Sequence, residues 1–118
     1  MSKSSSSAPI EKYFAAKAGE QIELVLECFT DGAVVWDNGE DKELRGTVEI
    51  RDWMSGTVAN YKLTSEVRTV EQKGEEFIAA VIVSGDFPGS PYEFAYRFKL
   101  EGDLISELAI DPVGSLAP

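Results

Sequence analysis

The feature that most restricts the fold is a series of strand patterns in the second half of the chain. Residues 92–100 alternate large apolar side chains with mainly polar ones, whereas the run at 77–83 is almost entirely apolar. The first pattern is typical of a strand with one buried face, and the second of a strand covered on both faces. Lys73 and Gly74 supply a hairpin turn before the apolar run. The sequence therefore predicts a meander with strands at residues 61–68, 77–83, 92–100 and 104–110.

Helical periodicity dominates the first half. After Pro9, apolar side chains recur at helical spacing up to Gly19, and a second stripe begins at Ile22 and ends before Asp31 and Gly32. These patterns predict helices over residues 9–18, 22–30 and 47–59, a short strand over 33–37 and an acidic loop over 38–43. The resulting order is α-α-β-α-β-β-β-β. Because the helices cluster early and the meander comes late, the sequence predicts the α+β class.

The length of 118 residues suits one domain with a real core. We place that domain at residues 9–112, between a flexible Ser-rich tail at 1–8 and a short C-terminal tail at 113–118. The opening residues hold no apolar segment of the kind found in signal peptides, and the longest apolar run is far shorter than the roughly 20 residues of a membrane helix. We therefore expect a cytoplasmic protein that does not bind membranes.

Composition excludes several chemistries. With 11 basic against 21 acidic residues and a net charge of -10, the chain lacks the basic patch that nucleic acids and anionic lipids require. It contains no histidine, so a Ser-His-Asp triad and a histidine-ligated metal are impossible. A single cysteine, Cys28, cannot form an intrachain disulfide. The glycine-containing stretch at 84–91 lacks the pattern of a phosphate-binding loop, so we predict no cofactor and no metal.

Several segments in this order carry a family resemblance. They are residues 13–19 (YFAAKAG), residues 33–37 (AVVWD), Arg45-Gly46 before the helix with Ile50 and Trp53, and residues 84–91 (SGDFPGSP). Together they resemble the SnoaL-like branch of the NTF2-like superfamily. The resemblance implies a curved antiparallel sheet wrapped around three helices as a cone, with an internal pocket between its concave face and the first helix. It also implies sheet-to-sheet homodimers. The superfamily includes ketosteroid isomerases, polyketide cyclases and non-enzymatic binding modules, so fold alone does not fix the function.

Two residues are candidates for catalysis. Strand alternation puts Asp37 on the same side as Val35 and Ala33, where a carboxylate facing an apolar interior can accept and return a proton. The other interpretation is an aspartate that opens a turn. The resemblance implies a proton-shuttling role for Asp37 and an oxyanion-donating role for Tyr13, whose position on the apolar stripe equally suits a core tyrosine.

The aromatic residues suggest a binding surface. Trp53, Tyr61, Phe94, Tyr96 and Phe98 are candidate ligand contacts, although each of them also suits ordinary packing. Phe94 is a departure from the family pattern, because it occupies the position where ketosteroid-isomerase-like relatives carry a second, protonated carboxylic acid. A faithful ketosteroid isomerase is therefore not expected.

These observations lead to two hypotheses. The first is a small-molecule-binding domain with an apolar pocket, acting as a cofactor-independent isomerase or cyclase with Asp37 as the base and Tyr13 or Tyr96 as the donor. The second is a non-catalytic homodimeric module whose cavity is filled by its own aromatic side chains. The apolar outer face at Ile78, Ala80 and Ile82 favours a homodimer through the convex side of the sheet.

Overall fold

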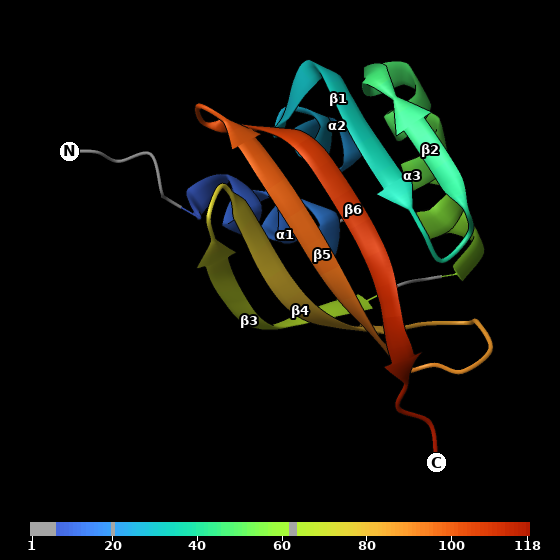
Figure 1. Ribbon diagram of the computed structural model, residues 1–118. Coiled ribbons are helices and arrows are strands. Elements are labelled where there is room, and N and C mark those ends of the chain that lie inside the picture. Colours follow the sequence, from blue (N-terminus) through green and yellow to red (C-terminus); the bar gives the residue numbers. More distant parts are fainter. Residues whose placement is uncertain (1–6, 20, 62–63) are drawn as a thin grey trace.

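A six-stranded sheet organises the computed structural model, which describes residues 7–19, 21–61 and 64–118, without the side chains of residues 57–61. The strand order is β2-β1-β6-β5-β4-β3, and each neighbouring pair is antiparallel except β1 and β6. Figure 1 shows the sheet curving around the helices. The strands are β1 Phe29–Asp37, β2 Lys42–Arg45, β3 Thr64–Lys73, β4 Glu76–Ser84, β5 Tyr92–Glu101 and β6 Leu104–Ser115.

The helices lie on one side of the sheet (Figure 1). They are α1 Ala8–Ala18, α2 Ile22–Leu26 and α3 Gly46–Tyr61. Helix α1 has a proline in its first turn, where a missing N–H costs nothing, and it buries Ile10, Tyr13 and Ala16. No helix in the described ranges has both the length and the hydropathy to cross a bilayer.

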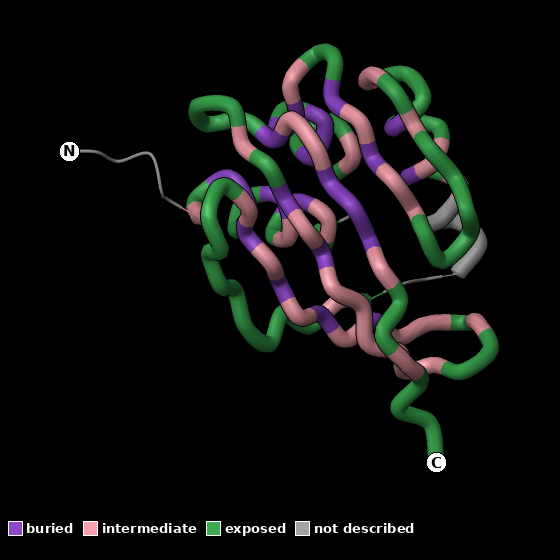
Figure 2. The backbone as a smooth tube through the Cα atoms, in the orientation of Figure 1, coloured by how far each residue is buried: buried purple, intermediate pink, exposed green. Residues whose placement is uncertain are grey.

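Burial alternates along the central strands, as Figure 2 shows. In β4, Phe77, Ala79, Val81 and Val83 are buried, whereas the residues between them are only partly buried. This period of two places one row of each strand against the helices. The largest fully buried side chains of the core include Tyr13, Phe98, Ile10, Ile50, Ile105 and Leu108.

The predicted α+β class and element order are present, with one additional strand. Residues 42–45 form β2, which pairs with β1, whereas the sequence suggested a loop up to residue 43. Asp41 adopts a left-handed conformation with φ of 57°, which closes the tight turn between the two strands. The Trp36 indole N–H then donates to Glu43 across the hairpin at 3.2 Å.

Three predicted boundaries differ from the structure. Helix α2 ends at Leu26, because the residues after it hydrogen-bond to strand β6. Phe29 pairs with Ile105, and the Ile105 N–H donates to the Cys28 carbonyl at 2.7 Å. Helix α3 includes Tyr61, whereas the sequence pattern predicts that the following strand begins at this residue. Strand β6 continues to Ser115, past residue 110, the predicted end of that strand. Tertiary hydrogen bonds thus override local helical periodicity at residues 28–30.

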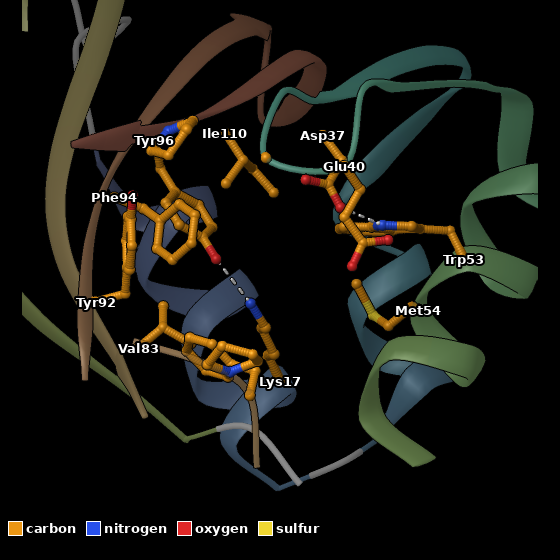
Figure 3. A pocket seen from close by; sticks show the side chains of 14 residues that line it. Lys17, Asp37, Glu40, Trp53, Met54, Val83, Tyr92, Phe94, Tyr96 and Ile110 are labelled. Carbon is orange, nitrogen blue, oxygen red and sulfur yellow. Dashed lines mark hydrogen bonds between the residues drawn. The ribbon is translucent and has the colours of Figure 1, made fainter. Parts of the chain in front are cut away.

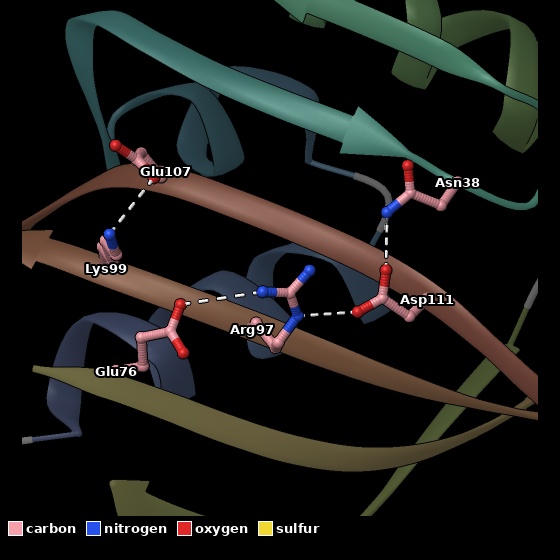
Figure 4. Close-up of polar contacts among 6 residues, drawn as sticks. All are labelled: Asn38, Glu76, Arg97, Lys99, Glu107 and Asp111. Carbon is pink, nitrogen blue, oxygen red and sulfur yellow. Dashed lines mark hydrogen bonds and ion pairs between the residues drawn. The ribbon is translucent and has the colours of Figure 1, made fainter. Parts of the chain in front are cut away.

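Charged side chains cross-link the outer face of the sheet (Figure 4). Arg97 on β5 donates to Asp111 on β6 at 2.7 Å and lies 3.8 Å from Glu76 on β4. The Asn38 amide donates to the other oxygen of Asp111. Partial burial raises the pKa of Asp111, but the hydrogen bonds from Arg97 and Asn38 outweigh it, and the net pKa is lowered. The convex face is therefore apolar along β4 and ionic along β5 and β6.

We predict that Asp111→Asn lowers the free energy of unfolding by at most about 1 kcal/mol at pH 7, because the pair is partly exposed to solvent. A carboxyl whose pKa is depressed by folding stabilises the protein above its unfolded pKa, near 3.9, and loses that effect as the pH falls through the lower folded value. The difference between wild type and variant should therefore shrink below about pH 4. Urea unfolding at pH 7 and pH 3 measures it.

The matched control is Asp103→Asn, which makes the same change in the exposed turn between β5 and β6. A wild-type to Asp111→Asn difference that stays constant with pH would contradict the electrostatic explanation.

Candidate functional site

A cavity of about 380 Å³ lies between the concave face of the sheet and the helices (Figure 3). Its wall is mostly apolar and aromatic, and polar side chains reach it from two sides. The lining residues include Lys17, Asp37, Trp53, Phe94, Tyr96 and Ile110. The volume is in the range of sites that enclose a small organic molecule.

Asp37 occupies one side of the cavity. It is the last residue of β1, and its backbone pairs with Ile110 of β6 and Lys42 of β2. The Trp53 indole N–H, on α3, donates to Asp37 Oδ2 at 2.9 Å. Among the residues that the structure describes, the other carboxylate oxygen has no hydrogen-bond partner. The hydrogen bond to Oδ2 thus orients the carboxylate, and Oδ1 is left able to accept a proton or a hydrogen bond from a ligand.

Lys17 and Tyr96 form a second polar group, which faces Asp37 from across the cavity (Figure 3). Lys17 lies in the last turn of α1 and donates from Nζ to the Tyr96 hydroxyl on β5 at 3.0 Å. The ammonium also lies 5.1 Å and 5.7 Å from the ring centroids of Tyr96 and Tyr13.

The Lys17 amine remains protonated at neutral pH. Burial lowers its pKa, but the interactions with Tyr13, Tyr96 and Asp37 more than offset burial, so the net pKa is raised. The C-terminal end of α1 also favours a cation. Lys17 is therefore a charged hydrogen-bond donor rather than a nucleophilic amine.

Sequence reasoning did not assign Lys17 to the site. The signal was nevertheless present, because Lys17 continues the apolar stripe of Ile10, Tyr13 and Phe14 at the i+7 position. A lysine on the buried stripe of a helix is uncommon and needs a partner.

The aromatic candidates have different positions. Trp53, Phe94 and Tyr96 line the cavity, together with Tyr92, which stacks obliquely on Phe94 with ring centroids 5.1 Å apart. Phe98 does not line it, because its side chain is fully buried in the core. The side chain of Tyr61 lies outside the described residues. Phe94 contributes an apolar wall and no acid at the position where the resemblance implies one.

Tyr13 lies in the core and does not line the cavity. Its ring makes edge-to-face contacts with Phe14, Phe29 and Phe98 at centroid distances of 5.0, 5.8 and 5.7 Å. The buried hydroxyl has no hydrogen-bond partner among the described residues. Burial raises the pKa of this phenol above its usual value. This placement favours packing for Tyr13 over the predicted donor role.

Glu40 is the second carboxylate at the cavity, on the turn between β1 and β2. It forms an ion pair with Lys42 at 3.3 Å, and both side chains are well exposed. Such a pair at the rim contributes little to stability. Within the described part of the chain, no three potential ligands are grouped closely enough to hold a metal ion.

A curved, unclosed sheet wrapped around three helices, with a cavity on its concave side, defines the NTF2-like class of cone folds. The chain belongs to the SnoaL-like domain family, whose sequence model matches residues 10–108. No curated protein matches the chain in a sequence search.

Solved structures agree with this assignment. A presumed polyketide cyclase from Sinorhizobium meliloti is 28% identical, with a TM-score of 0.84 over 88% of this chain and 94% of that one. A protein from Catenulispora acidiphila with a ketosteroid isomerase-like fold, crystallised with trimethylamine, is 17% identical, with a TM-score of 0.78 over 92% and 85%. TerC, co-crystallised with polyporic acid, is 9% identical, with a TM-score of 0.80 over 90% and 89%. The last two similarities concern the fold alone.

We predict that Tyr13→Phe raises the free energy of unfolding by up to about 1 kcal/mol, because it removes a buried hydroxyl without a partner and keeps the ring contacts. Thermal and urea unfolding measure the change. A loss of stability would indicate that the hydroxyl has a partner after all. Loss of any measured activity in the folded variant would restore the oxyanion-donor role predicted for Tyr13.

Proposed function

We propose that the protein binds a planar, cyclic or aromatic small molecule in this cavity and acts on it as a cofactor-independent isomerase or cyclase, with Asp37 as the proton shuttle. The observation that supports the proposal most strongly is the Asp37 carboxylate, held at one oxygen by the Trp53 indole at the edge of an aromatic-walled cavity. A carboxylate oriented in this way has the geometry of a general base.

The proposed reaction begins when Asp37 removes a proton from a carbon next to a ligand carbonyl. The electrons of the C–H bond form an enolate, and Asp37 holds the proton. In an isomerisation, Asp37 returns the proton to another carbon of the conjugated system; in a cyclisation, the enolate carbon attacks a second carbonyl of the same ligand, whose oxygen then takes up the proton. The Tyr96 hydroxyl is the donor for the enolate oxygen in either case.

The ligand class follows from the shape and polarity of the wall. Phe94 and Tyr92 give flat apolar surfaces that suit a planar ring system. The polyketide cyclase assignment of the Sinorhizobium meliloti protein and the polyporic acid bound to TerC are consistent with such a ligand.

The sheet-to-sheet homodimer stays a prediction. An apolar patch on the outer face of β4 favours it, formed by the partly exposed Ile78, Ala80 and Ile82. The charged side chains around Arg97 on the same face would have to meet opposite charges on the second copy. Size-exclusion chromatography with light scattering at micromolar concentration should give twice the chain mass of 12.9 kDa. A mass of 12.9 kDa would contradict the homodimer.

The test of the proposed activity compares the wild type with Asp37→Asn. A thermal-shift screen of planar enones, steroids, aromatic polyketide analogues and fatty acids first identifies a ketone that stabilises the wild type. NMR in D₂O then follows exchange of the protons next to its carbonyl. We expect Asp37→Asn to lower the exchange rate at least about 100-fold, because loss of a general base costs that much. The fold should survive, since the asparagine oxygen still accepts from Trp53.

The matched control is Asp41→Asn, which makes the same substitution in the same turn at an exposed residue with positive φ. Exchange that continues unchanged in Asp37→Asn contradicts the assignment, and its loss in Glu40→Gln instead would move the base to Glu40. If none of the compounds stabilises the wild type, the non-catalytic interaction module becomes the better explanation.

A further inference from the structure

Lys17 presents an ammonium to the cavity and forms no ion pair in the described part of the chain. Within the described residues, no carboxylate lies within 4.0 Å of its ammonium. The ion pairs that these residues do form join side chains that are exposed or partly exposed. Taking a cation out of water is costly unless an anion or several hydrogen bonds compensate. A partly buried, unpaired ammonium that lines a cavity therefore indicates an anion supplied from outside.

The donors around Lys17 are arranged for that purpose. An ammonium has three N–H donors, and Lys17 makes one hydrogen bond to the described residues, to the Tyr96 hydroxyl at 3.0 Å, while the buried Tyr13 hydroxyl also interacts with it. Because Tyr96 accepts this hydrogen bond, its own O–H remains able to donate. Figure 3 shows the Lys17 nitrogen and the Tyr96 oxygen together at the cavity, on the side away from Asp37 and Trp53.

We propose that Lys17 and Tyr96 bind an anionic oxygen of the ligand, so that the site takes planar ligands bearing a carboxylate or an enolate and orients them with this oxygen away from Asp37. The inference rests on the proposed function, because it assumes that a ligand occupies the cavity. It adds a specificity-determining residue, Lys17, and a charge for the ligand. In the proton transfer, the same ammonium compensates the negative charge that develops on the enolate oxygen.

The test uses two probes of nearly identical shape, 2-naphthoate and neutral 2-naphthamide, in calorimetric titrations at pH 7. The wild type should bind the carboxylate about tenfold or more tightly than the amide, since charge-assisted hydrogen bonds are worth that factor. Lys17→Met shortens the side chain by one atom and keeps the helix propensity, and it should remove this preference while it changes the affinity for 2-naphthamide by less than about threefold.

Two further variants sharpen the comparison. Lys12→Met removes a positive charge from the exposed side of the same helix and should leave the preference for the carboxylate intact. Asp37→Asn removes a negative charge from the opposite side of the cavity and should strengthen the binding of 2-naphthoate without changing that of 2-naphthamide. Circular dichroism and thermal unfolding establish that each variant is folded, and Lys17→Arg, which retains a cation, should restore part of the preference if Lys17→Met is unfolded.

Equal affinity of the wild type for the two probes, or a preference that persists in Lys17→Met, overturns the inference. Binding of neither probe to the wild type overturns it as well. These failures are distinct from failure of the proposed function: no preference for the anion, with exchange lost in Asp37→Asn, refutes only the role of Lys17. A clear preference for the anion, with exchange retained in Asp37→Asn, refutes only the proton shuttle.

Discussion

The parallel pairing of β1 with β6 is the constraint on which the site depends. It joins two strands that are far apart in the sequence and brings Asp37 opposite Ile110, with the Asn38 N–H bonded to the Ile110 carbonyl at 3.0 Å. A parallel pair needs a long crossover, and here α3 and the β3–β5 meander form it. The crossover carries Trp53 past the end of β1, so the same pairing provides both the carboxylate and the group that orients it.

A second constraint is the distribution of polar groups in an apolar core. Among the residues whose burial the structure describes, every fully buried one is apolar or aromatic, and charged side chains approach the interior at the cavity. Lys17 lies at the end of a helix whose other inward residues are Ile10 and Tyr13, so its ammonium is kept partly out of water by the packing of α1. The ammonium keeps a hydrogen bond to the Tyr96 hydroxyl in this position, so a charged group of α1 reaches the cavity from the apolar side of the helix.

Much of the fold could be predicted, because the periodicities of two and 3.6 are strong in this chain. Sequence could not distinguish Phe94 from Phe98, since alternation puts both on one face of β5. The tertiary arrangement separates them: Phe98 is covered by Tyr13 and Phe14 of α1, whereas Phe94 lies beyond the helix at the cavity. Strand β2 was missed and the predicted second helix was too long, because both features depend on pairing with β1 or β6 rather than on local pattern. Asp37 was found by alternation, whereas Lys17 was not recognised.

The two polar groups give the cavity a direction. Asp37 reaches it from the end of β1, and Lys17 reaches it from the last turn of α1, with aromatic walls between them. The Asp37 carboxylate attracts the Lys17 ammonium through space, but the two groups form no ion pair and belong to separate elements. The two side chains come from the last turn of α1 and the end of β1, and both line the cavity. The proposed ligand, with an acidic C–H at one end and an electron-rich oxygen at the other, matches this arrangement, because its C–H would face Asp37 and its oxygen would face Lys17.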